Sequence, residues 1–163
     1  MLSAGKMLDP LTAISLAGNV VQFVDFSGKI ISKTRELIKS PHGLTQDAYD
    51  AENVIRDLSS LAEKLKDGVR ATGAVSQTDD EKVLQDLCNG CIDLSESFLQ
   101  RLEKLKLREG AGKRHAFLRA LKAVWSQKDL ENDETRLATY RSQLEFRVLT
   151  SFRLVTIKLL LFT

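Results

Sequence analysis

The sequence predicts an all-α fold, an elongated up-and-down bundle of four to five helices. Apolar residues recur at the three- and four-residue spacing of helices over most of the chain, and no long stretch alternates like a strand. The 163 residues include only 2 prolines and 9 glycines, so long uninterrupted helices are allowed. A hydrophobic content of 43% and a charged content of 28% are ordinary for a globular domain with one core.

The first helix is expected over residues 10–39. Asp9 is a good cap, and Pro10 suits the first turn, where a missing N–H group is harmless. No charged residue lies between Leu11 and Val24, so we expect this helix to be the most buried one in the resting protein. Pro41 and the glycine that follows shortly after it end the helix.

Two further helices follow in the central part of the chain. The second is expected from a cap at Thr45 to about Val69, and the third opens with the capping pattern of residues 78–81. Each carries one apolar stripe. The stripe of the second helix is Ala51, Val54, Ile55, Leu58, Leu61, Ala62 and Leu65, and that of the third is Val83, Leu84, Leu87, Cys91, Leu94, Phe98, Leu102 and Leu105.

The last two helices are expected over residues 113–124 and from Lys128 to the end. Trp125 lies between them and is predicted to anchor that corner by packing. We expect the last helix to continue through Leu137, Tyr140, Leu144, Val148 and Leu149. Residues 1–8 read as a flexible extension, residues 9–152 as the bundle, and residues 153–163 as an apolar tail. The tail is expected to pack along the bundle, with a partner-facing surface and a frayed end as the alternatives.

No residue pattern points to catalysis, a metal or a cofactor. Cys88 and Cys91 form a C-x-x-C in mid-helix with no second pair, which suits neither a redox site nor zinc. The run Gly-Ala-Gly-Lys-Arg at residues 110–114 lacks the first glycine and the final hydroxyl residue of a phosphate loop. With two histidines in the chain and no nucleophile set, we expect no enzyme, and an enzyme ranks third among the functions considered.

A basic stretch covers residues 104–122, where seven lysines and arginines are countered only by Glu109. Lys113, Arg114 and Arg119 are candidate contacts to anionic lipid headgroups or to an acidic partner. The alternative is a solvated face that complements the acidic residues of 79–96. Nucleic acid is disfavoured because aromatic residues for base stacking are missing.

No signal peptide and no constitutive transmembrane helix are expected. The longest apolar stretch is interrupted by Asn19 and Gln22 before it reaches the ~18–20 residues that a bilayer requires. We therefore expect a soluble resting protein in the cytoplasm, recruited to the plasma membrane on activation.

Two blocks of the sequence carry a resemblance to a known family. The first is Asp-Pro-Leu-Thr-Ala-Ile-Ser-Leu-Ala-Gly-Asn-Val-Val-Gln-Phe-Val-Asp-Phe at residues 9–26. The second is Ala-Leu-Lys-Ala-Val-Trp-Ser-Gln-Lys-Asp-Leu at residues 120–130, followed by Arg136, Leu137, Tyr140, Arg141 and Leu144. Together they resemble the N-terminal, HeLo-like and SesA-related helical domain of fungal NACHT-type STAND receptors, the fungal NOD-like receptors. The resemblance spans roughly residues 9–152.

The resemblance implies an effector or signalling domain for programmed cell death, in heterokaryon incompatibility or innate immunity. It implies self-association on activation, release of the first helix and targeting of a membrane; in the family a NACHT module follows the domain. Carried onto this chain, the membrane or oligomer residues of the first helix are Leu11, Ile14, Leu16, Val20, Val21, Phe23, Val24 and Phe26. The main alternative is a protein–protein adaptor that docks a downstream signalling protein and has no membrane activity.

Overall fold

The computed structural model describes residues 10–39, 51–72, 79–106 and 114–162. Within these ranges the chain forms five helices and no strand: α1 (Pro10–Lys39), α2 (Ala51–Thr72), α3 (Asp79–Lys106), α4 (Arg114–Val124) and α5 (Gln127–Leu161). The all-α prediction is therefore confirmed for the described part of the chain.

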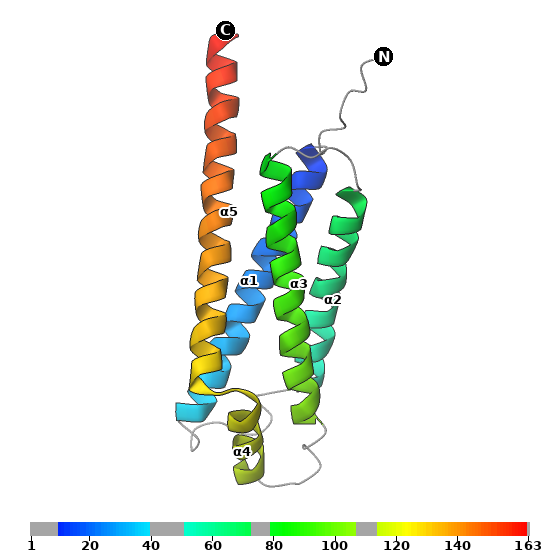
Figure 1. The fold of residues 1–163 in the computed structure, drawn as a ribbon, viewed down its shortest axis with the longest axis vertical. Helices are drawn as coiled ribbons and strands as arrows, with labels where there is room; N and C mark the ends of the chain where they lie inside the picture. Colours follow the sequence, from blue (N-terminus) through cyan, green and yellow to red (C-terminus); the bar gives the residue numbers. More distant parts are fainter. Residues whose placement is uncertain (1–9, 40–50, 73–78, 107–113, 163) are drawn as a thin grey trace.

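The long helices alternate in direction (Figure 1). α1 descends, α2 rises beside it, α3 descends, and α5 rises along α1 after the short α4 has turned the chain at the lower end. α1 and α3 each contact all four other helices, so α1 shares the central position with α3 and is not alone in it. α5 extends beyond the upper ends of the other helices.

The helix boundaries follow local signals in the sequence. α1 has the predicted bounds. The predicted start of the second helix, Thr45, lies outside the described residues. The corner before α5 is made by Ser126, whose extended backbone (φ −73°, ψ 161°) places its hydroxyl to accept a hydrogen bond from the Asp129 N–H group. Asp129 accepts in return from the Ser126 N–H group at 3.0 Å, which completes a capping box.

Trp125 is the largest fully buried side chain and lies at this corner, as predicted. Its ring meets Phe98 of α3 edge-on, with centroids 5.1 Å apart and planes at 82°. The core continues upward between α1, α2 and α3 through buried leucines and through Cys88 and Cys91. This core positions every surface considered below.

Candidate functional site

The inner face of α1 follows an uninterrupted heptad pattern. Residues 16, 20, 23, 27, 30, 34 and 37 alternate in steps of four and three, and all seven are buried. This is the spacing by which helices interlock along their length in coiled coils. We call this set the α1 seam; its members are Leu16, Val20, Phe23, Ser27, Ile30, Thr34 and Leu37.

Two members of the seam are polar. Ser27 and Thr34 are both 0% exposed, and neither hydroxyl oxygen has a hydrogen-bond partner within the described ranges. A buried hydroxyl without a partner destabilises a fold by about 1–3 kcal/mol. α1 is therefore bound to the core less firmly than its apolar residues alone would make it.

The outer face of α1 exposes apolar side chains to solvent. Ile14 is 68% exposed and Val21 is 45% exposed; they are seven residues apart and so share a face with Gly18. A Cβ atom on Gly18 would meet no atom within 4 Å, which confirms that this stripe is open.

The eight candidate residues of α1 thus fall on different faces. Leu16, Val20, Phe23 and Val24 are buried, as a core helix requires in the resting state. Phe26 is half-buried and packs against the core, while Ile14 and Val21 are exposed. The side chain of Leu11 lies outside the described residues.

Two ion pairs fasten α1 to α5. Arg141 Nη2 donates to Asp25 Oδ1 at 2.7 Å, between side chains that are each 56% exposed. Arg35 donates from Nη1 to Glu134 Oε1 at 3.2 Å and from Nη2 to Glu134 Oε2 at 2.8 Å. These hydrogen bonds from Arg35 lower the pKa of Glu134 below its ordinary value of 4.5. The Nε atom of Arg35 is buried without a partner among the described residues, so even this pair is incompletely satisfied.

The candidate basic contacts are not brought together by the described structure. Arg119 lies exposed on α4. Lys113 lies outside the described residues, and so does the side chain of Arg114, the first residue of α4. The headgroup prediction for these three residues remains a prediction.

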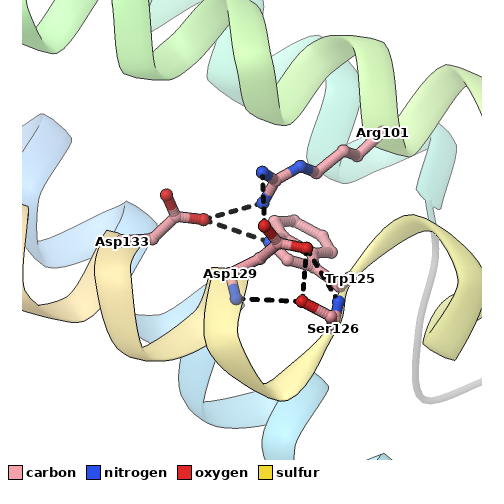
Figure 2. Close-up of polar contacts among 5 residues, drawn as sticks. All are labelled: Arg101, Trp125, Ser126, Asp129 and Asp133. Carbon is pink, nitrogen blue, oxygen red and sulfur yellow. Dashed lines mark hydrogen bonds and ion pairs between the residues drawn. The ribbon is translucent and has the colours of Figure 1, made fainter.

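Among the residues with a described side chain, the most buried charged group lies at the α4–α5 corner (Figure 2). Asp133 is 4% exposed, and its Oδ2 atom accepts from Arg101 Nη1 at 2.8 Å and from Trp125 Nε1 at 3.2 Å. The Arg101 guanidinium also lies 5.3 Å from the Trp125 ring centroid and 3.8 Å from Asp129 Oδ1. Sequence reasoning missed this cluster because Arg101 and Asp133 are 32 residues apart and belong to different helices.

This cluster holds α3 against the corner between α4 and α5. An open depression beside it is lined by Ser97, Arg101, Asp129, Asn132, Asp133, Thr135 and Arg136. Arg101 already binds the carboxylates of Asp129 and Asp133, and the lining contains no histidine or cysteine. In the part of the chain that the structure describes, no group of three or more histidine, cysteine or acidic side chains is placed to hold a metal ion.

The two cysteines are buried in α3 and unbonded. Burial raises the pKa of each thiol to about 12, so both are protonated at neutral pH. Their surroundings are those of core side chains.

The second half of α5 departs from the sequence prediction. α5 is helical through Leu137, Tyr140, Leu144, Val148 and Leu149, as predicted. Leu137 and Leu144 are buried and Tyr140 is half-buried, whereas Val148 and Leu149 are exposed, at 39% and 62%. The expected packing of the tail along the bundle is wrong, since Ile157 and residues 159–162 are 53–90% exposed. The tail is helical, and α5 carries these residues past the end of the bundle, where no other described helix covers them.

None of the described helices is both long and apolar enough to cross a bilayer. Comparisons with protein-family models, with curated proteins and with solved structures found no match.

Proposed function

We propose that this chain is an effector or signalling domain of the fungal NOD-like receptor kind, which induces programmed cell death by oligomerising and targeting a membrane through α1. The observation that carries the proposal is the construction of α1. Its buried seam holds the hydroxyls of Ser27 and Thr34, which have no hydrogen-bond partner among the residues that the structure describes, while its outer stripe holds exposed Ile14 and Val21. Such a helix fits its own core imperfectly and has apolar surface on both sides.

Release of α1 is energetically demanding for a single copy. Seven buried apolar side chains leave the core with it: Leu16, Val20, Phe23, Val24, Ile30, Ile31 and Leu37. Burial of each side chain contributes about 1.5–3 kcal/mol, so exposing all seven to water would cost roughly 10–20 kcal/mol. That cost is as large as the free energy of unfolding of a typical domain, ~5–15 kcal/mol. A monomer therefore keeps α1 in place, and release requires a new environment that buries the same surface.

An oligomer supplies that environment. The heptad spacing of the α1 seam suits packing against a second α1 as well as against its own bundle. Serine and threonine hydroxyls hydrogen-bond across helices that pack together in lipid. Ser27 and Thr34 would gain in an α1–α1 contact the partners that they lack in the resting fold. The unpartnered hydroxyls thus lower the difference in free energy between the two arrangements.

Dye release from vesicles containing anionic lipid tests this proposal. The domain is fused to a module that forces it to oligomerise, and compared with Ile14→Asp/Val21→Asp in the same fusion. Both substituted positions are exposed, so the core stays intact, whereas charges at Val20 or Val24 would unfold the bundle. Ser60→Asp/Gln100→Asp is the matched control, because it adds the same charge at exposed sites on α2 and α3.

The proposal expects release by the parent and the control, and little release by the α1 variant. If the forced oligomer releases no dye although it is folded, the membrane role fails and the adaptor function takes its place.

A further inference from the structure

The outer stripe of α5 changes character half-way along the helix. Residues that follow one another at steps of three, four or seven share one face of a helix. On this face the first half of α5 presents exposed polar residues, Lys128, Thr135, Thr139 and Ser142. The second half continues the same face with Phe146, Leu149, Ile157 and Leu160, which are 53–71% exposed. Between Leu149 and Ile157 the same spacing falls on Arg153, whose side chain lies outside the described residues.

This apolar stripe faces away from the bundle. The core-facing row of α5 is Leu130, Leu137 and Leu144, at seven-residue spacing, whereas Phe146 and Leu149 follow the solvent-facing row. On the solvent side these four apolar side chains, together with exposed Leu161, are more than scattered surface leucines explain. It therefore has the form of a contact surface.

The charges of the second half of α5 indicate which kind of surface its apolar face contacts. After Glu145 the remaining residues of α5 include Arg147, Arg153 and Lys158 and no acid, whereas residues 127–145, Glu145 included, carry five acids and three bases. A helix that combines an apolar face with lysine and arginine and no acid suits the surface of an anionic bilayer. Two copies pairing along this stretch would instead bring six positive charges together, which disfavours self-association there.

Length indicates how the contact is made. The stretch from Phe146 to Phe162 is about 25 Å long at helical rise, which is shorter than the ~30 Å hydrocarbon core of a bilayer. With three basic residues inside it, it does not qualify as a span. Lying in the interface, it would bury its outer stripe among the headgroups and keep the bundle on the water side.

We infer that the second half of α5 is an interfacial helix that docks the domain on anionic lipid surfaces. The inference goes beyond the proposed function, since it places the first lipid contact on α5 of the resting monomer, without release of α1. It rests on the proposed function only in taking a membrane as the target.

Co-sedimentation of the monomer with vesicles tests it, using phosphatidylcholine alone and phosphatidylcholine mixed with phosphatidylserine. Leu149→Asp/Leu160→Asp removes the stripe at exposed positions, and Thr139→Asp/Ser142→Asp is the matched control on the same face below it. The parent and the control should bind the anionic vesicles, and the stripe variant should bind at least ten-fold more weakly. Lys158→Gln, at an exposed position, should weaken binding roughly five-fold, as expected for one basic residue near the surface.

Absence of binding by the parent, or undiminished binding by a correctly helical stripe variant, would overturn the inference. So would a concentration-dependent dimer in solution that the stripe variant abolishes, since the occupant would then be a second copy. The variant Ile14→Asp/Val21→Asp distinguishes docking through α5 from membrane release through α1. It should still co-sediment with anionic vesicles and yet release no dye when forced to oligomerise. Co-sedimentation can therefore fail while dye release persists, and dye release can fail while co-sedimentation persists.

Discussion

Ser27 and Thr34 lie one heptad apart on α1, both fully buried, and neither hydroxyl is hydrogen-bonded within the described ranges. Val20 precedes them at the same heptad position and is also fully buried. One row of the α1 seam is therefore apolar at its start and polar along the rest. The other row, which includes Phe23 and Ile30, is apolar throughout.

Replacing both hydroxyls should stabilise the resting fold. Ser27→Ala/Thr34→Val removes two unsatisfied groups and keeps nearly the same shape, so the free energy of unfolding should rise by about 1–2 kcal/mol for each. Chemical denaturation measures the change. Ser32→Ala on the exposed side of α1 is the control and should change stability by less than about 0.5 kcal/mol. A loss of stability in the double variant would mean that the hydroxyls have partners in solution.

Gly90 of α3 should not tolerate a side chain. A Cβ atom there would lie 2.6 Å from the hydroxyl oxygen of Tyr140 and 2.9 Å from its Cζ atom. The displacement of Tyr140 should cost about 1–3 kcal/mol. This exceeds the gain of about 0.5–1 kcal/mol in helix propensity from glycine to alanine, so Gly90→Ala should lower the free energy of unfolding. Thermal unfolding measures this, with Gly18→Ala as a control that should stabilise, because no atom lies within 4 Å of its Cβ position. Tyr140→Leu added to Gly90→Ala should recover most of the loss; no recovery would place the cause elsewhere.

Removing the Asp133 carboxylate should weaken the α4–α5 corner. Asp133→Ala leaves the guanidinium of Arg101 and the indole N–H of Trp125 without their shared acceptor. Because the Arg101 side chain is 19% exposed, we expect a loss of about 3 kcal/mol, at the low end of the range for buried pairs. Trp125 fluorescence during denaturation measures it, and Asp93→Ala at an exposed site of α3 should be nearly neutral. Equal effects of the two variants would contradict a structural role for the cluster.

Stability should fall when the solution becomes acidic. Hydrogen bonds from Arg35 lower the pKa of Glu134 below 4.5, and hydrogen bonds from the hydroxyl and N–H groups of Ser126 lower the pKa of Asp129 below 3.8. Both carboxyls bind a proton less readily in the folded state than in the unfolded state. Their stabilisation is thus complete above about pH 5, and it is lost as pH falls through the lowered values.

Thermal midpoints between pH 7 and pH 3 measure this dependence. Glu134→Gln should flatten the decline, because one of the two groups no longer titrates, while Glu103→Gln at an exposed site of α3 should leave its shape unchanged. A decline that is the same in Glu134→Gln and in the parent would show that this ion pair does not contribute.

The thiols of Cys88 and Cys91 should be unreactive in the folded protein. Both are buried, and burial raises the pKa of each to about 12, so that at pH 8 about one thiol in ten thousand is ionised. Labelling with a disulfide reagent should follow the rate of unfolding and reach two thiols per chain in denaturant. Rapid labelling of the native monomer would contradict the burial.

The sequence predicts some of these features and leaves others out, for physical reasons. The bounds of α1 follow from Pro10 and from the Pro41 stop, and the burial of Trp125 follows from its place between two helical patterns. Ser27 and Thr34 escape prediction because an apolar pattern skips polar residues, although the heptad spacing runs through them. The pairing of Arg101 with Asp133 depends on how separate helices pack, which local spacing does not encode.

The exposed half of α5 shows a different limit. Helical periodicity predicts which residues share a face, but not whether another helix lies against that face. Val148 and Leu149 continue the helix, yet both side chains are exposed. At the end of α5, the length of this helix relative to the others leaves Ile157 and residues 159–162 exposed.

Hydrogen exchange during forced oligomerisation on anionic vesicles tests the central claim most directly, namely that α1 leaves its own core. In the monomer, α1 and the segments of α2 and α3 around Leu58 and Leu94 should be protected together. In the membrane-bound oligomer α1 should stay protected, while those segments of α2 and α3 exchange faster because α1 no longer packs against them. Unchanged protection of α2 and α3 in oligomers that release dye would contradict the claim.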